Sequence, residues 1–231
     1  MKKTEQQQPR CIGIIIDGNR RWARARGLPI FEGHRAGYEK VKEFLRWARD
    51  VGATHVIAYA FSSENWKRAP EEVSYLMKLL KHACIAEVEE FKKENARIRV
   101  IGDRARLSAD VRNAIESAEE TTKSCTGPTL VLAISYGGRD EVLHAVNSLI
   151  ADTHAAPVTA ENFSQRLWTA GIPDPDLIIR TSGEKRLSNF LPWQSVYSEL
   201  FFIDTLWPDF TKEEFLQILE DYQNRERRFG K

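Results

Sequence analysis

Near its amino terminus the chain reads Ile12-Gly13-Ile14-Ile15-Ile16-Asp17-Gly18-Asn19-Arg20-Arg21-Trp22. A short run of β-branched residues that ends in Asp-Gly is typical of a buried parallel strand, and the Arg/Ala-rich segment after it is typical of a helix. Asp17 then stands at the carboxyl end of a strand, where open α/β sheets bind ligands, beside a turn suited to an anion. A carboxylate next to an anion requires a cation between them, so Asp17 indicates Mg²⁺ together with a diphosphate. A plain Asp-Gly turn that caps the helix explains this stretch equally well.

The composition is that of an ordinary globular protein. Of 231 residues, 42% are hydrophobic and 29% charged, and 34 Lys and Arg against 33 Asp and Glu leave a net charge of +1. This balance argues against nucleic acid as a partner, so any anion site is local. The cysteines, Cys11, Cys84 and Cys125, are too far apart for a disulfide framework or structural zinc. With no secretory or membrane-spanning segment evident, we expect a cytoplasmic protein that is at most peripheral to the membrane.

Strand and helix patterns alternate along the chain. After the first strand, apolar runs predict strands at 55–61, 97–101, 130–134, 177–179 and 200–203. Amphipathic patterns predict helices at 35–51, 70–93, 108–122, 140–150 and 160–169, and a terminal helix from 211. The apolar side of this last helix, expected to dock on the body, is formed by Phe215, Ile218, Leu219 and Tyr222. We therefore expect an α/β fold in a single domain, 11–231, after a flexible polar segment, 1–10. Its central sheet has about six mostly parallel strands, with helices on both faces.

Polar segments follow four of these strands. They are Asp17 with its turn, residues 62–68, Gly137-Gly138-Arg139 and residues 180–188. Parallel strands place such segments at one edge of the sheet, so we expect them to meet in one cleft. Arg180, Arg186 and Ser188 suit a second phosphate-bearing ligand, although a solvated charged face is the alternative.

Single residues near this cleft are open to two interpretations. Asn65 can orient a proton or a diphosphate, and Trp66 can wall an apolar ligand, or the two can serve as a cap and a packing residue. His34 is a diphosphate ligand or a capping group, and Glu199 is a candidate second carboxylate for the metal.

Motifs spread over nearly the whole chain are similar to those of the cis-prenyltransferases of the undecaprenyl diphosphate synthase type. The matching segments are Asp17-Gly18-Asn19-Arg20-Arg21-Trp22-Ala23, Gly33-His34-Arg35-Ala36-Gly37, Phe61-Ser62-Ser63-Glu64-Asn65-Trp66, Tyr136-Gly137-Gly138-Arg139, Ile179-Arg180-Thr181-Ser182-Gly183-Glu184, Arg186-Leu187-Ser188-Asn189-Phe190, Trp193-Gln194 and Tyr197-Ser198-Glu199-Leu200. Ile30 departs from the arginine found in many bacterial members, and Arg20 from a common glycine.

The resemblance implies Mg²⁺-dependent condensation of isopentenyl diphosphate with an allylic diphosphate, a hydrophobic product tunnel, and a product delivered to the membrane. It assigns catalysis to Asp17 and Asn65, and the metal to Asp17 and Glu199, the latter alone or with help from the partner subunit. The substrate-binding residues that it implies are Gly18, Asn19, Arg20, Arg21, Trp22, His34, Ser62, Ser63, Glu64, Trp66, Arg68, Arg180, Arg186, Leu187 and Ser188. It also implies a homodimer in which Arg228-Phe229-Gly230 reaches the neighbouring site.

Two other functions remain open at this stage. A non-catalytic subunit of a heteromeric cis-prenyltransferase is one, but such partners typically lack the residues that stand here as Asp17 and Asn65. The other is an enzyme of the same family with a different primer or a shorter product.

Overall fold

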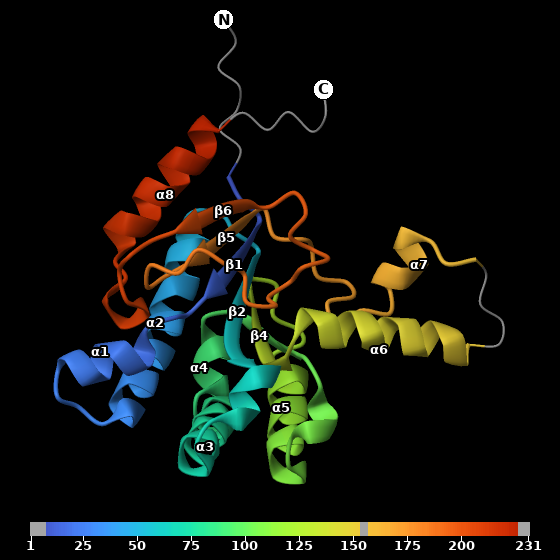
Figure 1. Ribbon diagram of the computed structural model, residues 1–231, viewed down its shortest axis with the longest axis horizontal. Helices are drawn as coiled ribbons and strands as arrows, with labels where there is room; N and C mark the ends of the chain where they lie inside the picture. Colours follow the sequence, from blue (N-terminus) through green and yellow to red (C-terminus); the bar gives the residue numbers. More distant parts are fainter. Residues whose placement is uncertain (1–7, 153–156, 226–231) are drawn as a thin grey trace, which may run out of the picture.

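The computed structural model describes residues 8–152 and 157–225, and its centre is one six-stranded sheet (Figure 1). The strands are β1 (Cys11–Ile15), β2 (His55–Ser62), β3 (Arg97–Ile101), β4 (Thr129–Tyr136), β5 (Leu177–Arg180) and β6 (Glu199–Phe202). They lie in the order β3-β4-β2-β1-β5-β6, and every adjacent pair is parallel. This confirms the predicted single-domain α/β fold. Because the chain adds strands first on one side of β1 and then on the other, a ligand crevice is expected at the carboxyl ends of β1 and β5.

The helices connect these strands. They are α1 (Asn19–Ala25), α2 (Ile30–Asp50), α3 (Pro70–Ala86), α4 (Val88–Lys93), α5 (Ala109–Thr121), α6 (Gly138–Ala151), α7 (Ala160–Ser164) and α8 (Lys212–Asn224), with short 3₁₀ turns η1 (Ser63–Lys67), η2 (Arg104–Arg106) and η3 (Trp207–Asp209). Among the described helices there is none with the length and apolar character needed to cross a bilayer.

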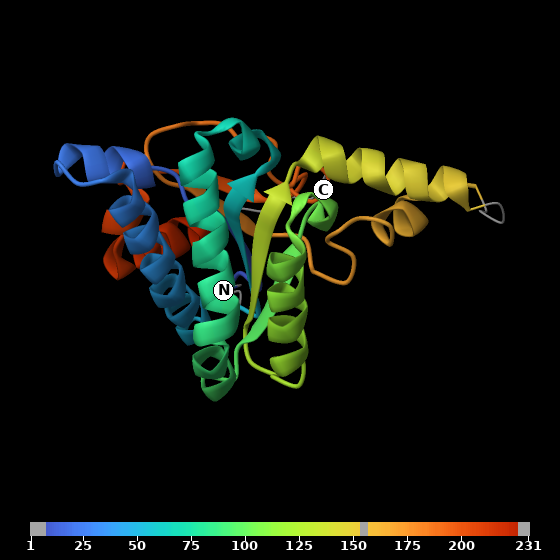
Figure 2. The same cartoon turned by 90° about the horizontal axis from the view of Figure 1, so that it is seen from below.

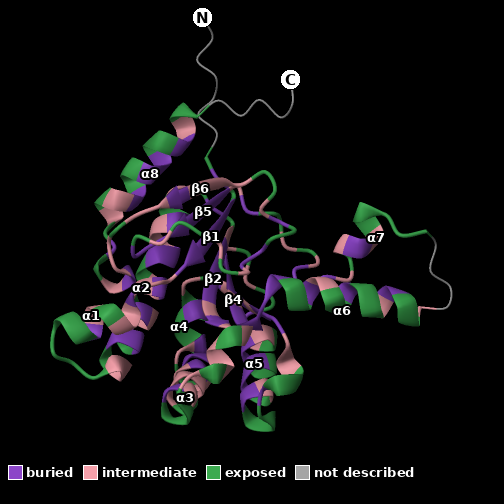
Figure 3. Ribbon diagram, viewed as in Figure 1, coloured by how far each residue is buried: buried purple, intermediate pink, exposed green. Residues whose placement is uncertain are grey.

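The two faces of the sheet are covered differently. Buried side chains of α2, α3, α5 and α8 pack on one face, and Figure 2 shows α2, α3 and α5 side by side there. The other face packs mainly against connecting segments, through residues such as Trp168, Leu187, Phe190 and Leu191. The strands are accordingly the most buried part of the molecule, whereas α6 extends away from the body (Figure 3). This arrangement leaves the carboxyl ends of β1, β2 and β5 open to a cleft.

Helix α2 begins at Ile30, five residues earlier than the pattern from Arg35 predicted. Pro29 stands at its amino-terminal cap and Glu32 lies in its first turn, both of which favour a helix start. The glycine at position 33 is explained by contact between helices, since a Cβ there would lie 2.1 Å from the carbonyl oxygen of Asn19. His34 is therefore a helical residue that faces the interior.

The helix predicted over residues 70–93 is broken into α3 and α4 at Glu87. The carboxylate of Glu87 accepts hydrogen bonds from Tyr38 and Lys42 of α2. The break between α3 and α4 thus lies at a contact with α2. The hydrophobic periodicity of a single helix carries no information about such a contact. The helix predicted to reach Thr169 also ends earlier, at Ser164.

The last helix, α8, docks on the sheet through the residues that its periodicity indicated. Phe215, Ile218, Leu219 and Tyr222 are all buried in the main core. The predicted contact of Arg228-Phe229-Gly230 with a neighbouring subunit concerns residues outside those that the structure describes.

Candidate active site

A cleft of about 780 Å³ lies at the carboxyl ends of β1, β2 and β5. Its walls come from the turn after β1, from α1, from His34 of α2, from the η1 segment and from the segment after β5. The lining residues are Ile15, Ile16, Asp17, Gly18, Asn19, Arg20, Arg21, Arg24, His34, Tyr59, Ala60, Ser62, Glu64, Asn65, Arg68, Arg180, Ser188 and Asn189. Three of the four segments predicted to converge do so, and they bring several cations and the carboxylates of Asp17 and Glu64 to one place.

Asp17 is held from both sides of the cleft. Its carboxylate accepts a hydrogen bond from Arg180 at 2.9 Å and lies 3.5 Å from the guanidinium of Arg21. Its carbonyl oxygen accepts hydrogen bonds from the Thr181 hydroxyl and from the Trp207 backbone. Gly18 follows in the left-handed region, with φ of 111°, which permits the sharp turn into α1. The side chain is therefore both exposed to the cleft and fixed in position.

Arg180 is the cation at the centre of the site. Only 5% of its side chain is exposed, and besides Asp17 its guanidinium donates to the Ser188 hydroxyl at 2.7 Å and to the carbonyl oxygen of Arg186. The structure thus brings Arg180 and Ser188 together as predicted. The side chain of Arg186 is exposed and pairs with Glu184 outside the cleft.

The η1 segment places Asn65 at the cleft. The Asn65 side-chain oxygen accepts a hydrogen bond from the backbone N–H of Ser62, so the residue fixes the turn that carries it. Burial alone would raise the pKa of the neighbouring Glu64, but hydrogen bonds from backbone N–H, Ser62 and Asn189 outweigh it and lower that pKa. Glu64 is therefore a carboxylate at neutral pH.

Several predicted site residues lie elsewhere. The Trp22 indole donates to Asp209, and the Arg26 guanidinium stacks on its ring at 4.4 Å. The Trp66 indole donates to Ser135 and its ring packs against Phe61, behind the cleft. Ser63 lines a separate hollow, and Leu187 packs on the sheet.

The segment Gly137-Gly138-Arg139 supports the cleft without lining it. The backbone N–H groups of Gly138 and Arg139 donate to the main-chain and side-chain oxygens of Asn189. A Cβ at Gly138 would lie 2.0 Å from Pro192. The glycine is therefore explained by packing, and its segment holds Asn189 at the cleft.

Glu199 does not share a site with Asp17 within one chain. The strand register pairs Ile12 with Leu177 and Leu177 with Glu199, so Glu199 lies level with Ile12 at the amino edge of the sheet. At a rise of about 3.3 Å per residue, it lies roughly 16 Å from Asp17 along the strands alone. Its carboxylate instead pairs with Arg225 at 2.6 Å. The two carboxylates therefore do not meet within one chain, and a metal site that joins them across two subunits stays a prediction.

The residues that remain still suit Mg²⁺. The part of the chain that the structure describes contains no group of three or more His, Cys, Asp or Glu able to hold a metal. Mg²⁺ is, however, commonly held by one or two carboxylates together with substrate phosphates and water. Asp17, with its carboxylate facing a cation-lined cleft, fits that kind of site.

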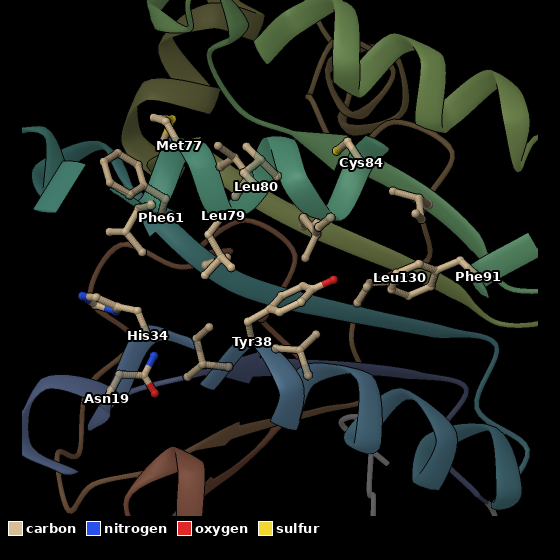
Figure 4. Close-up of a pocket in the computed structure, with 18 residues that line it drawn as sticks. Asn19, His34, Tyr38, Phe61, Met77, Leu79, Leu80, Cys84, Phe91 and Leu130 are labelled. Atoms are coloured by element: carbon tan, nitrogen blue, oxygen red, sulfur yellow. The ribbon is translucent and has the colours of Figure 1, made fainter. Parts of the chain in front are cut away.

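A second, mainly apolar cavity lies next to the cleft, and Figure 4 shows the side chains that line it. It has a volume of about 90 Å³ and lies between α2, α3 and the sheet, with walls that include Val41, Leu76, Leu80, Phe91 and Leu130. Ile16, Asn19, His34 and Ala60 line both the cavity and the cleft, so the two spaces adjoin. A charged head group and an apolar tail on one ligand would match this arrangement.

Sequence reasoning missed four polar residues of the site. Arg24, Tyr59 and Asn189 line the cleft, and Glu72 lies directly behind it, buried against His34 and Arg68. Burial raises the pKa of Tyr59. In the sequence, Glu72 is explained by its place in the acidic first turn of a helix, without any role in the site. The nearest available signal was its spacing of four residues from Arg68, which is also typical of a surface ion pair.

Comparison with known proteins places the chain in a family. Residues 15–230 match the family model for undecaprenyl diphosphate synthase. An isoprenyl transferase of Rhizobium meliloti is 53% identical, covering 96% of this chain and 92% of the relative. One of Thermotoga maritima is 47% identical, covering 96% and 97%.

Solved structures agree with this assignment. Lavandulyl diphosphate synthase from Lavandula x intermedia, in complex with dimethylallyl diphosphate, has a TM-score of 0.92 at 34% identity and covers 97% of this chain and 99% of that one. A probable undecaprenyl diphosphate synthase from Campylobacter jejuni has a TM-score of 0.83 at 36% identity, with 97% and 100% covered. The chain therefore belongs to the undecaprenyl diphosphate synthase family of cis-prenyltransferases.

Proposed function

We propose that the chain condenses isopentenyl diphosphate with an allylic diphosphate primer, farnesyl or geranylgeranyl diphosphate, in a Mg²⁺-dependent reaction. The product is a long-chain polyprenyl diphosphate such as undecaprenyl diphosphate, the precursor of a glycosyl carrier lipid. The observation that carries this proposal is that a cation-lined cleft adjoins an apolar cavity. An allylic diphosphate has the matching chemistry, with its head group in the cleft and its hydrocarbon tail in the cavity.

Different residues of the cleft bind the two diphosphate substrates. Arg20, Arg21, His34 and Arg68 bind the allylic diphosphate, whose negative charge grows as its bond to carbon breaks. Mg²⁺ carried with this diphosphate and held by Asp17 would stabilise the same charge.

The isopentenyl substrate takes the other side of the cleft. Arg180 and Ser188 bind its diphosphate, and the exposed Arg186 approaches from the rim. Asn65, held by Ser62, orients the proton that the isopentenyl unit loses when the new carbon–carbon bond forms.

The direct test is incorporation of labelled isopentenyl diphosphate. The protein is incubated with the label, Mg²⁺ and, in separate reactions, dimethylallyl, farnesyl or geranylgeranyl diphosphate, and the products are sized by chromatography. We expect a long product with farnesyl or geranylgeranyl diphosphate and none when Mg²⁺ is chelated. Failure of all three primers to accept label would overturn the proposal.

A shorter product is the second candidate, because the cavity is small. Its volume of about 90 Å³ is less than the ~150 Å³ of an engineered cavity that holds benzene. A long chain therefore requires the wall formed by α2 and α3 to move outward. Products that stop after one or two additions with every primer would establish the shorter-product enzyme.

We also propose that the enzyme acts as a homodimer. Helix α6 extends from the body and exposes Leu143, Val146 and Ile150, at 59%, 37% and 76%, along one side. Val196 and Tyr197 add further exposed apolar surface. An apolar stripe of this kind supports an interface with a second copy.

The C-terminal residues are expected to act at the neighbouring subunit's site. Because α8 docks through Phe215 to Tyr222, a truncation after Arg227 should stay folded and dimeric, by circular dichroism and light scattering, yet lose most of its activity. Mixing it with Asp17→Ala protein should restore part of the activity, since each heterodimer has one site with both an intact Asp17 and a donated tail. No recovery despite proven subunit exchange would show that the tail serves its own chain.

A further inference from the structure

Glu72 is a buried carboxylate at the junction of the cleft and the cavity. It lies in the first turn of α3, and only 2% of its side chain is exposed. One oxygen, Oε1, accepts a hydrogen bond from Arg68 at 2.9 Å and lies 3.0 Å from Nε2 of His34. The same oxygen lies 3.8 Å from Nε of Arg20. Groups from α1, α2 and the η1 segment thus meet on one atom of α3.

The position of Glu72 on its helix is informative. Leu76 and Leu80 follow at intervals of four residues on the same face of α3, and both line the cavity. Met77 and His34 are seen around the same space in Figure 4. Glu72 therefore places a negative charge where the apolar wall of the cavity meets the cleft. The head group of a bound ligand would lie next to this point.

A buried carboxylate is costly unless it is paired, so the contacts of Glu72 are specific interactions and not incidental ones. Burial lowers the pKa of His34 and of Arg68, while the negative charge of Glu72 opposes both shifts. Its hydrogen bond also fixes the orientation of the imidazole ring and of one edge of the guanidinium. The remaining donors of these groups are left for the cleft, which His34 and Arg68 both line.

We propose that Glu72 is a positioning residue, which holds Arg68 and His34 in the geometry that grips the allylic diphosphate where the cleft meets the cavity. The inference rests on the proposed function and adds to it a residue that contacts no substrate. It concerns the diphosphate head group and not the hydrocarbon tail. This distinction makes it testable with two ligands.

The experiment measures the dissociation constants of inorganic pyrophosphate and of farnesyl diphosphate by calorimetry, with Mg²⁺ and without isopentenyl diphosphate. The main variant is Glu72→Gln, which keeps the shape and removes the charge. Glu71→Gln is the matched control, because Glu71 is the exposed neighbour in the same helical turn. We expect Glu72→Gln to raise the dissociation constants of both ligands at least tenfold and by the same factor. Glu71→Gln should leave these constants within twofold of the wild type. The KM of Glu72→Gln for isopentenyl diphosphate should change less than twofold.

A double-mutant cycle separates positioning from a general loss of structure. If Glu72 acts through Arg68, then Glu72→Gln combined with Arg68→Gln should weaken pyrophosphate binding by much less than the product of the two single effects. Independent, multiplying effects would overturn the inference. If Glu72→Gln does not fold, Glu72→Asp is used instead, because it keeps the charge but has a side chain that is shorter by one methylene. We expect it to weaken the binding of both ligands by the same tenfold factor.

Three further results would contradict the inference. Unchanged binding by a folded Glu72 variant would show that Arg68 and His34 need no support. Tighter binding would show that Glu72 competes with the ligand for these cations. A larger loss for farnesyl diphosphate than for pyrophosphate would show that the cavity wall had been disturbed instead. Wild-type protein that binds neither ligand would overturn the proposed function as well, whereas tight wild-type binding that Glu72→Gln leaves intact overturns only the role of Glu72.

Discussion

Asp17→Ala is expected to lower kcat by about 10³-fold or more, equivalent to roughly 4 kcal/mol of lost transition-state stabilisation. Asp17 is the carboxylate that contacts Arg180 and Arg21, whereas Glu64, the other carboxylate that lines the cleft, pairs with Asn189 and is not expected to replace it as the proposed Mg²⁺ ligand. Steady-state kinetics with saturating Mg²⁺ and both substrates measure the effect. The variant should remain folded, because Arg180 keeps its contacts with Ser188 and the carbonyl oxygen of Arg186.

Asp17→Asn is the control for shape. An amide oxygen still accepts the hydrogen bond from Arg180 but carries no charge and is a poor Mg²⁺ ligand. We expect Asn to recover the melting temperature and to leave kcat low. Turnover near the wild-type rate in either folded variant would remove Asp17 from the catalytic assignment.

Arg180→Ala is expected to raise the KM for isopentenyl diphosphate by about 10- to 100-fold, which matches the roughly 1.5–3 kcal/mol of a charge-assisted hydrogen bond. The KM for the primer should change by no more than a few fold. Arg180 sits on the β5 side of the cleft with Ser188, whereas His34 and Arg68 line the α2 and η1 side. A fall in kcat is also expected, because Arg180 orients Asp17.

Arg180→Lys tests whether the forked guanidinium is needed. Arg180 uses two terminal nitrogens to reach three acceptors, and a lysine ammonium lacks that fixed fork. Arg180→Lys should therefore reverse only part of the rise in KM for isopentenyl diphosphate that Arg180→Ala causes. If Arg180→Ala raises both KM values equally, the division of the cleft between the two diphosphates is wrong.

Local pattern in the sequence was enough to predict the strands, their mostly parallel arrangement and the edge of the sheet at which polar segments meet. Asp17, Asn65 and Arg180 each stand at or shortly after the carboxyl end of a strand, and parallel strands end at one edge, so their meeting in a cleft could be predicted. The docking of α8 through Phe215 and Tyr222 also followed from periodicity, because a helix buries its apolar side wherever it packs.

The tertiary structure alone decided which polar groups meet. Glu199 stands at the start of its strand, and the parallel register through β5 to β1, which local sequence does not report, separates it from Asp17 within one chain. Trp22 turned toward Asp209, and Glu72 reached His34, which is 38 residues away. Hydrophobic periodicity reports which side of an element is buried, but the partner of a polar side chain depends on elements that are distant in the chain. The residues at the strand ends could therefore be predicted from local sequence. Their ion-pair partners depend on how α1, α2, α3 and the sheet pack together.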